Sequence, residues 1–308
     1  MARTKRGKPI NGWIVVDKPA GITSAQVVAR VKRALGASKV GHGGTLDPLA
    51  TGVLPIACGE ATKTVTYVMD GIKTYWFRVR WGEGRDTDDA EGAVIATSDH
   101  RPTREGILAA LPSFVGEIEQ VPPIFSAIKV DGQRAYDLAR ADKPVTLVAR
   151  PVFVRSFELV EMPDVDHADF KAVCGKGTYV RSLARDLARA VGTHGHVVSL
   201  RRARVGPFSE ERAIPLDKLE SIVHTAPASD YLLSVATALD DIPALALTGA
   251  EAHRLSQGQP LAVTELAARV PLDTIGADAT VRAMLDGRVV ALARIEGGEV
   301  RSLRNMNL

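Results

Sequence analysis

Alternating apolar and polar residues predict β-strands in several parts of the chain. The clearest alternation is TYWFRVRW, Thr74–Trp81. Its apolar face consists of Tyr75, Phe77, Val79 and Trp81. In GWIVVDKPAG, residues 12–21, the apolar residues are instead continuous and end at Pro19 and Gly21, which predicts a strand buried on both faces.

Two other stretches have the spacing of amphipathic helices. Thr23 and Gln26 form a capping-box pair, and Gly36 is a stop signal, so we predict a helix between them. A strand and a glycine turn in FKAVCGKGTY lead into a second helix, which begins at Val180 and ends before Gly192. Its arginines recur every four residues on one stripe: Arg181, Arg185 and Arg189.

The strands and helices do not alternate regularly, and this favours an α+β fold over a doubly wound sheet. A composition break lies near residues 209–235. We therefore predict a main domain over residues 1–225 and a small C-terminal domain over 230–308. Short β-compatible runs with glycine turns, PLAVTEL and RVVALARIEGGEV, predict that the second domain is a compact β domain.

Composition narrows the class of protein. No apolar run approaches the roughly 20 residues of a membrane span, and only the short IVV follows the basic N-terminus, so we expect neither a membrane protein nor a signal peptide. The 2 cysteines, Cys58 and Cys174, are too few for a disulfide framework. We expect a cytoplasmic protein.

Charge is unevenly distributed although the net charge is only +3. Residues 1–40 carry nine basic residues and one acidic residue, and residues 171–208 carry eight and one. Residues 209–308 are acidic, with nine basic and 14 acidic residues. Two basic segments far apart in sequence suit a polyanion-binding face, but two solvated helix faces explain the same charges equally well.

Several common site types are missing from the sequence. CGKGTY lacks the first glycine of a phosphate-binding P-loop. His194 and His196 form the only close histidine pair, with no acid nearby, so we expect surface-loop histidines and no metal site. There is no GxSxG, and Cys58 lies in the apolar run VLPIACG, which predicts an inert core position.

One acid lies in an unusual loop, GHGGTLDPLATG, residues 41–52. Asp47-Pro48 alone is explained by a simple turn. The glycines around it, however, permit a bulky ligand to approach the backbone, and the loop leads into an apolar strand. A carboxylate near the core needs a cation or donors, because burying an unpaired charge is costly. From the residues alone, Asp47 remains a candidate.

Six ordered blocks resemble one known family, the TruB-type tRNA pseudouridine-55 synthases, from about residue 10 to 215. These blocks are DKPAGITS (17–24), GHGGTLDPLATGVLPI (41–56), KTYWF (73–77), VPPIFSAIKVDGQRAYDLAR (121–140), GKGTYVRSLARDL (175–187) and SLRRARVGPF (199–208). The resemblance implies a mixed, mainly antiparallel sheet flanked by helices. The C-terminal segment resembles the PUA-like domain of bacterial members.

The resemblance also implies roles for individual residues. It implies that Asp47, Tyr75 and Arg181 are catalytic, and it implies these substrate-binding residues: His42, Tyr179, Leu200, Lys18 and Asp89. Residues 121–150 resemble the insertion that closes over the RNA. Two positions depart from the family pattern, namely Gly43, where threonine is usual, and Arg85, which replaces the first threonine of T-D-T-x-D-x-x-G. The acidic residues Asp88 and Glu91 in that loop also fit a solvated hairpin.

The implied reaction is the isomerisation of uridine 55 in the T-loop of tRNA. It needs no cofactor and no metal. The Asp47 carboxylate has three routes open to it: attack at C1′, attack at C6, or removal of the C2′ proton. Each requires an ionised carboxylate, and we expect Arg181 to keep its pKa low.

Two alternatives remain beside this interpretation. The first is a non-catalytic tRNA-binding or folding chaperone on the same scaffold. The second is a guide-RNA-dependent enzyme, although the short basic tail favours the stand-alone form. We expect a monomer whose partner is the T-arm stem-loop of tRNA. Arg185, Arg189 and three arginines near residue 200 should divide between structural and phosphate contacts: Arg201, Arg202 and Arg204.

Overall fold

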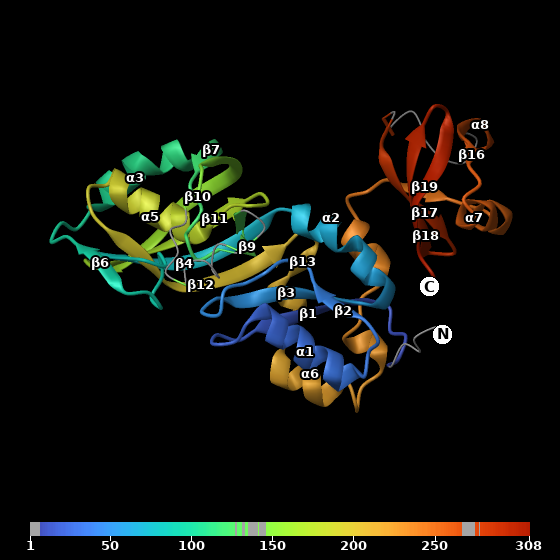
Figure 1. Ribbon diagram of the computed structural model, residues 1–308, viewed down its shortest axis with the longest axis horizontal. Coiled ribbons are helices and arrows are strands. Elements are labelled where there is room, and N and C mark those ends of the chain that lie inside the picture. Colours follow the sequence, from blue (N-terminus) through green and yellow to red (C-terminus); the bar gives the residue numbers. More distant parts are fainter. Residues whose placement is uncertain are drawn as a thin grey trace.

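The computed structural model describes residues 7–126, 128–130, 133–134, 141, 146–266, 275–276 and 278–308. Within these residues the chain forms a ten-stranded mixed sheet, a five-stranded sheet near the C-terminus and two short hairpins (Figure 1). Most neighbouring strands of the large sheet are antiparallel, and helices cover it. The predicted α+β class, with a mainly antiparallel sheet and a C-terminal β domain, is confirmed.

The large sheet has a strand order that differs from the order in sequence. Its main path is β14 (Ile214–Pro215), β1 (Gly12–Lys18), β3 (Thr51–Cys58), β12 (Gly195–Val205), β4 (Lys73–Trp81), β11 (His167–Cys174), β10 (Arg150–Asp164) and β7 (Gly116–Gln120). Two short strands lie beside this path: β2 (Val40–His42) next to β3 and β13 (Phe208–Ser209) next to β12. β12 pairs with β3 only at Arg201–Thr51 and Arg202–Gly52, so a short parallel contact joins the two halves of the sheet.

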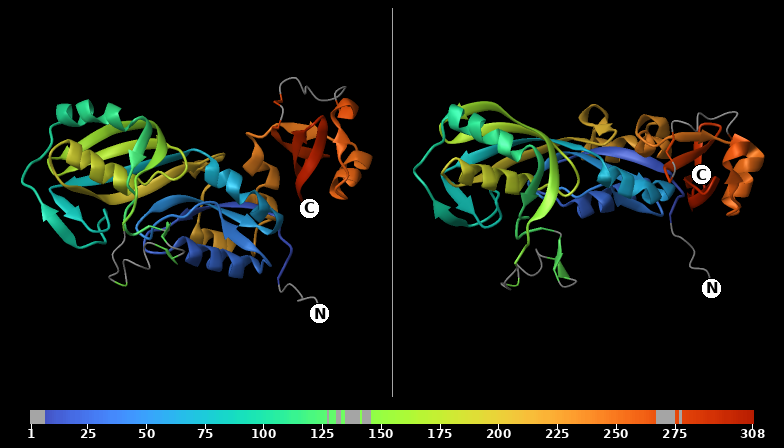
Figure 2. Two further views of the ribbon diagram at one scale, coloured as in Figure 1. Left: turned by 45° about the horizontal axis from the view of Figure 1, so that its top comes forward. Right: turned by 90° about the horizontal axis from the view of Figure 1, so that it is seen from above.

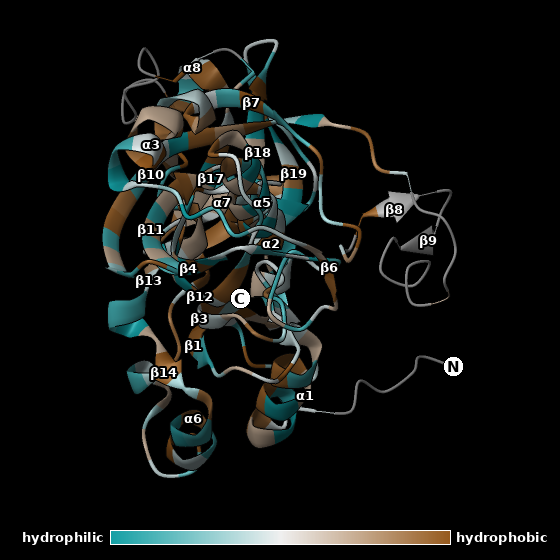
Figure 3. Ribbon diagram, turned by 90° about the vertical axis from the view of Figure 1, so that its left-hand side faces the viewer, coloured by the Kyte–Doolittle hydropathy of each residue, from teal (hydrophilic) through white to brown (hydrophobic). Residues whose placement is uncertain are grey.

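Helices cover both halves of the sheet. Among the described residues up to 222 the helices are α1 (Ser24–Leu35), α2 (Val65–Asp70), α3 (Arg104–Ala110), α5 (Val180–Ala190) and α6 (Leu216–Ile222), with 3-10 turns η1 (Gly59–Thr64), η2 (Leu111–Phe114) and η3 (Glu210–Arg212). The predicted capping box of Thr23 and Gln26 is present, and Gly36 ends α1 in the left-handed conformation. Helices α1 and α6 lie side by side, and their polar residues face outward (Figure 3).

The predicted alternation along β4 is confirmed. Phe77, Val79 and Trp81 are buried and Tyr75 is partly buried, while Trp76 on the other face is exposed. Buried residues of α5 pack on this inner face, in the same core cluster as Phe77. Two further hairpin strands, β5 (Glu83–Arg85) and β6 (Val94–Thr97), flank the acidic loop, and the hairpin of β8 (Lys129–Val130) and β9 (Gln133–Arg134) projects from the sheet (Figure 2).

The C-terminal region forms a separate core. The elements that the structure describes from residue 228 onward are η4 (Ala228–Asp230), η5 (Val235–Leu239), β15 (Ala244–Ala246), α7 (Gly249–Ser256), β16 (Leu261–Ala262), α8 (Val263–Leu266), β17 (Thr280–Leu285), β18 (Arg288–Glu296) and β19 (Glu299–Asn305). Lys63 Nζ donates to the carbonyl oxygen of Asn305 at 2.8 Å, which links this region to η1. Leu233 exchanges backbone hydrogen bonds with Trp13. The boundary between residues 225 and 230 stays a prediction.

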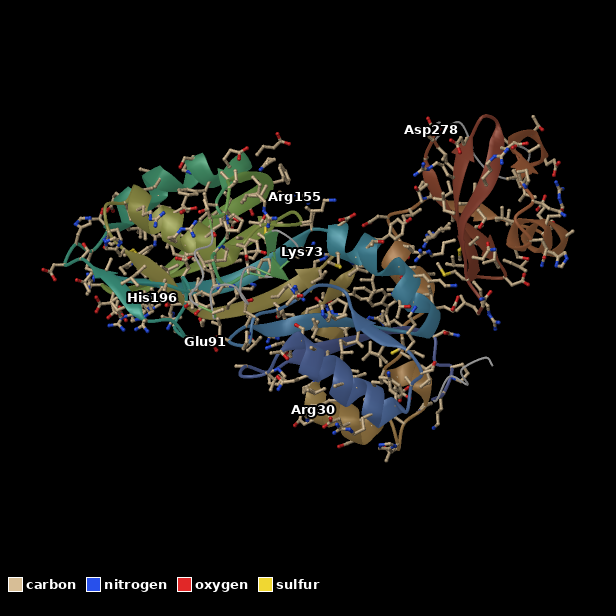
Figure 4. All side chains as sticks on the ribbon, viewed as in Figure 1. Arg30, Lys73, Glu91, Arg155, His196 and Asp278 are labelled. Carbon is tan, nitrogen blue, oxygen red and sulfur yellow. The ribbon has the colours of Figure 1, made fainter. Side chains whose placement is uncertain are left out.

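Two sequence expectations are wrong. His196 is not on a surface loop but buried on β12 among the strands (Figure 4), where its Nδ1 lies 3.0 Å from the carbonyl oxygen of Glu83. Asp88 is also buried, because the guanidinium of Arg185 approaches its carboxylate at 2.8 Å. Glu91 is exposed as expected. In the described part of the chain, no helix is both long and apolar enough to cross a bilayer.

Candidate active site

Asp47 lies in the loop that connects β2 to β3, at the point where β3 approaches β12. Gly44 and Gly52 have φ angles of 122° and 98°, which L side chains rarely adopt, so the loop path depends on glycine at both positions. The carbonyl oxygen of Pro48 accepts a hydrogen bond from Gly21 N at 2.8 Å. The turn after β1 is thereby attached to the Asp47 loop.

Arg202 fixes this loop from beneath. Its guanidinium is buried and donates to three backbone carbonyls: Val53 at 2.9 Å, Thr45 at 3.2 Å and Gly44 at 3.1 Å. Five donors in a rigid fork suit an arginine to such a set of acceptors. Of the two roles expected for Arg202, the structural one is therefore the one that its contacts support.

Lys18 has a similar structural position, and this differs from the predicted contact with substrate. The residue is 0% exposed, and its Nζ donates to the carbonyls of Pro19, Pro48 and Ala50 at 2.9, 3.1 and 2.6 Å. All three ammonium protons are engaged, so the side chain has no free donor for RNA. Burial lowers the pKa of Lys18 to about 8.

Arg181 connects three segments at the N-terminal end of α5. Its Nη2 lies 3.0 Å from Oδ2 of Asp47, and its Nη1 lies 3.4 Å from Oδ2 of Asp89. The guanidinium also donates to the carbonyls of Thr87 at 2.8 Å and Phe125 at 2.9 Å. The Arg181 side chain is 4% exposed. The predicted pair of Asp47 and Arg181 is therefore present, and Asp89 belongs to the same network.

The acidic loop between β5 and β6 is ordered by its own side chains. Thr87 Oγ1 donates to Asp89 Oδ1 at 2.6 Å, and Glu91 N donates to the same oxygen at 3.1 Å. Asp89 is buried. It pairs with the Arg181 guanidinium, and its predicted contact with substrate stays a prediction.

The Asp47 carboxylate keeps an open side. Its side chain is 35% exposed, and Oδ1 accepts no hydrogen bond from any residue that the structure describes. Burial of the carboxyl group raises the pKa of Asp47 above its ordinary value. The positive charges of Arg181 and Lys18 act in the opposite direction. The expectation that Arg181 keeps this pKa low is wrong, because desolvation outweighs the ion pair.

Tyr75 faces the same side of β4 as the core and lies near Arg202, which is its cross-strand neighbour on β12. Burial raises the pKa of the Tyr75 phenol, and the Arg202 guanidinium opposes this increase. The phenol is therefore protonated at neutral pH. A protonated phenol is able to donate a hydrogen bond beside Asp47, but it is not a tyrosinate base.

Three further residues with predicted roles in substrate binding are His42, Leu200 and Tyr179. His42 ends β2, and its Nδ1 is buried without a hydrogen-bond partner among the described residues. Burial lowers the pKa of His42, so the ring is neutral at neutral pH. Leu200 is buried on β12. Tyr179 caps α5, and its backbone N–H and carbonyl both bond to the side chain of Gln120, at 2.8 and 3.2 Å.

Gln120 and Arg202 extend the candidate site beyond the sequence prediction. Gln120 is buried and determines where α5, and hence Arg181, begins. No motif in the sequence marks it, since the residue only precedes the VPPIF block. The sequence does contain an indication for Arg202, because the basic run RRAR is unusual on a central strand. The burial of its side chain is apparent only in the fold.

Gly43 differs from its expected role. A Cβ added there would lie 2.9 Å from Val68 Cγ1 and 3.2 Å from the Trp13 ring. The glycine at this position is explained by tight packing against α2 and β1, and not by the approach of a ligand. Gly52 is similar, because an added Cβ would lie 2.3 Å from the Arg202 carbonyl oxygen.

Part of the predicted insertion, 121–150, lies outside the described residues, which here are 121–126, 128–130, 133–134, 141 and 146–150. Within the described chain no group of three or more His, Cys, Asp or Glu side chains is arranged to hold a metal ion. Cys58 is buried in the core, as predicted, and burial raises the pKa of its thiol to about 12.

Comparisons with known protein families match residues 32–242 of the chain. Residues 32–180 match the TruB family pseudouridylate synthase N-terminal domain, and residues 181–242 match the tRNA pseudouridylate synthase B C-terminal domain. A tRNA pseudouridine synthase B of Rhodospirillum rubrum is 58% identical over 308 residues, with 100% of both chains covered. The protein of the same name from Gluconacetobacter diazotrophicus is 60% identical over 300 residues, covering 97% of this chain and 98% of its own.

Solved structures share the fold. A Cbf5-Nop10-Gar1 complex contains a chain that is 26% identical, with a TM-score of 0.73 and coverage of 100% of this chain and 90% of that one. An H/ACA RNP bound to a substrate RNA containing 2'-deoxyuridine contains a chain with a TM-score of 0.74 and 23% identity, covering 100% and 92%. At that identity the second likeness concerns the fold alone.

Proposed function

The chain belongs to the TruB family of pseudouridine synthases, and we propose that it isomerises a uridine of tRNA, uridine 55 in the T-loop, to pseudouridine. Two relatives named tRNA pseudouridine synthase B, at 58% and 60% identity over nearly the whole chain, support the enzyme class and the RNA substrate. The site residues supply the chemistry. The observation that carries the proposal is the pair of Asp47 and Arg181, in which one carboxylate oxygen is held at 3.0 Å and the other has no hydrogen-bond partner among the described residues.

We propose Asp47 as the group that initiates the reaction. Pseudouridine formation breaks the N1–C1′ bond, rotates the uracil and joins C5 to C1′, so atoms and electrons balance without a co-reactant. Arg181 holds Oδ2, while Oδ1 accepts no hydrogen bond from the described residues and has a lone pair available. Attack at C1′, attack at C6 and proton removal at C2′ are all compatible with this arrangement.

Tyr75 is proposed to stack on the uracil and to donate or relay a proton. Its ring lies on the inner face of β4, near Asp47, and its phenol is protonated because burial raises its pKa. The proton lost from C5 after the new bond forms must leave the pocket. A hydroxyl that both donates and accepts is suited to pass it toward solvent.

A uridine inside a folded T-loop must leave its stack before Asp47 reaches it, at a cost of a few kcal/mol. The neutral His42 ring, with an unpaired buried nitrogen, is proposed to occupy the vacated position in the RNA. The basic segments 1–40 and 171–208 are proposed to supply phosphate contacts. We further propose a stand-alone, cytoplasmic monomer that requires no metal.

The decisive experiment measures tritium release from tRNA that contains 5-tritiated uridine. Asp47→Asn should retain tRNA binding and lose release almost entirely, whereas Asp217→Asn, an exposed carboxylate on α6, should behave as the unchanged protein. Substantial turnover by Asp47→Asn would exclude Asp47 as the initiating group. Pseudouridine mapping of the product identifies the position, and turnover of an isolated T-arm hairpin tests independence from a guide RNA.

The chaperone alternative is tested with the same variant. If refolding of misfolded tRNA by Asp47→Asn matches that of the unchanged protein, then folding activity exists beside catalysis and does not depend on it. If the unchanged protein refolds tRNA but forms no pseudouridine in any tRNA, the enzyme proposal is overturned.

A further inference from the structure

The outer face of the large sheet presents a tryptophan between two cations. Trp76 follows Tyr75 on β4, so it points away from the catalytic side, and it is 40% exposed. Its cross-strand neighbours are Lys171 on β11 and Arg201 on β12. The three side chains thus form a row across adjacent strands. Helix α5 packs on the opposite face of these strands, in the core cluster that contains Phe77.

A groove of about 660 Å³ adjoins this row. Its sides are Trp76, Arg78, Ser199 and Arg201 from the strands, with Leu49 and Glu91 from the neighbouring loops. This volume falls in the range of sites that enclose a small organic molecule, which is about 300–1,000 Å³. A second hollow of about 510 Å³ shares Thr51 and Arg201 with the groove. The two form a path across the outer face.

The basic side chains beside Trp76 differ in whether they have carboxylate partners. Arg78 makes two hydrogen bonds to Asp169, at 2.6 and 2.7 Å, and Arg201 binds Asp17 and Glu210. Lys171 is paired with no carboxylate in the described structure, and its Nζ lies 5.4 Å above the centre of the Trp76 ring. The site therefore combines a cation that has no carboxylate partner among the described residues with a partly exposed aromatic ring, over which that cation lies in this structure.

We propose that this face binds an unpaired nucleotide of the RNA substrate, whose base stacks on Trp76 while Lys171 contacts its phosphate. An open antiparallel sheet with a central aromatic and flanking cations is a common platform for single-stranded RNA. The ammonium of Lys171 is on a flexible four-carbon stem, so it is able to leave the ring for a phosphate when a base arrives. Stacking tolerates any base, and so this contact is expected to add affinity without sequence specificity.

The proposal separates binding from catalysis. The Tyr75 side chain lies on the inner face of β4, and the Trp76 side chain lies on the opposite face of the same strand. Loss of Trp76 should therefore weaken RNA binding and leave the rate constant of the bound complex unchanged. Because the main readout is binding, it remains interpretable even if the proposed reaction were wrong.

Fluorescence offers a direct test, since Trp13 and Trp81 are both 0% exposed and Trp76 is the exposed one of the 3 tryptophans. The probe is the hexaribonucleotide CACACA, which contains no uridine for the catalytic site and does not pair with itself. We expect saturable quenching that is absent in Trp76→Phe. If free AMP gives half-maximal quenching at the same concentration as the hexaribonucleotide, the ligand is a mononucleotide and the RNA proposal is overturned. If Trp76 emission does not change with either probe, this face binds no nucleotide.

Affinity for full-length tRNA provides the second measurement. Trp76→Ala should raise the Kd about tenfold, because the base loses the aromatic ring on which it stacks, whereas Trp76→Phe should retain most of the affinity. Lys171→Ala should weaken binding a few-fold and reduce the salt slope by about one. The matched control is Lys218→Ala, an exposed lysine on α6.

Single-turnover tritium release at saturating protein completes the test. The expected rate constant is unchanged in Trp76→Ala and Lys171→Ala. A fall in this rate constant at unaltered Kd would overturn the proposal, because Trp76 would then support the catalytic side of the sheet. Near-ultraviolet circular dichroism identifies any variant that fails to fold, and in that case Trp76→Phe and Lys171→Ala carry the comparison.

Discussion

Arg181 Nη2 lies 3.0 Å from Asp47 Oδ2, although the two residues are far apart in the sequence. The same guanidinium reaches Asp89 at 3.4 Å and two backbone carbonyls. Asp47 thus has one oxygen held by a buried cation and one oxygen open. This asymmetry supports the proposal that Asp47 initiates the reaction.

Replacing Arg181 by methionine tests this pair. The change leaves the buried Asp89 without its cation, so we expect the free energy of unfolding to fall by about 3–5 kcal/mol and tritium release to be nearly lost. Urea unfolding and single-turnover kinetics measure the two effects. The control is Arg189→Met, on the same helix but with its side chain 65% exposed. Similar losses in both variants would contradict a special role for Arg181.

The pH dependence follows from the pKa of Asp47, which burial raises. The ionised form reacts, so the rate constant should fall as the pH drops, with a midpoint above the ordinary aspartate value of about 3.9. Asp89 is a like charge that adds to this increase. Asp89→Asn should therefore move the acid limb to lower pH, while Asp86→Asn, which does not contact Arg181, should leave it in place. A shift to higher pH in Asp89→Asn would refute the assignment.

Arg202 offers a prediction about the loop itself. Methionine at this position would leave the carbonyls of Val53, Thr45 and Gly44 without their donor, at a cost of about 1–3 kcal/mol for each buried group left unsatisfied. We expect lower stability and a loss of kcat larger than any change in KM, since the loop carries Asp47. Arg204→Met, an exposed neighbour, should change little. A normal kcat in Arg202→Met would show that the loop is positioned by other contacts.

Gly43 gives a prediction with a built-in rescue. Gly43→Thr should destabilise the protein by about 1–3 kcal/mol through overpacking, because the new Cβ would lie 2.9 Å from Val68 Cγ1. Val68→Ala in the same chain should recover much of this loss. Thermal unfolding of the two single variants and the double variant yields the coupling. Simple additivity would mean that the two side chains do not compete for the same space.

Sequence patterns predict the local elements well. The capping box at Thr23, the alternation along β4 and the stripe of α5 are local, so each is visible in a window of about a dozen residues. Asp47, Arg181 and Tyr75 are far apart in sequence, and the resemblance to the family is what groups them into one predicted site. Their predicted roles remain proposals, while the ion pair between Asp47 and Arg181 is present in the fold.

Properties that depend on burial are not predictable from such patterns. Lys18, Asp88 and His196 are polar residues, and only the tertiary structure places them inside. The pKa of Asp47 has the same origin, because desolvation comes from residues distant in sequence and outweighs the nearby cation. From the sequence, ligand access is the expected reason for Gly43. Its actual neighbours, Trp13 and Val68, are distant from it in sequence, so the tight packing around it is visible only in the fold.

The position of β12 has a consequence for synthesis of the chain. This strand, Gly195–Val205, lies between β3 and β4, which are far closer to each other in sequence. On the ribosome, β1 and β3 are able to pair early, and β4 has β11 as a later partner, but the two halves have no common strand until residue 205 has emerged. Asp47 and Tyr75 therefore come to share one pocket only when two thirds of the protein has been made.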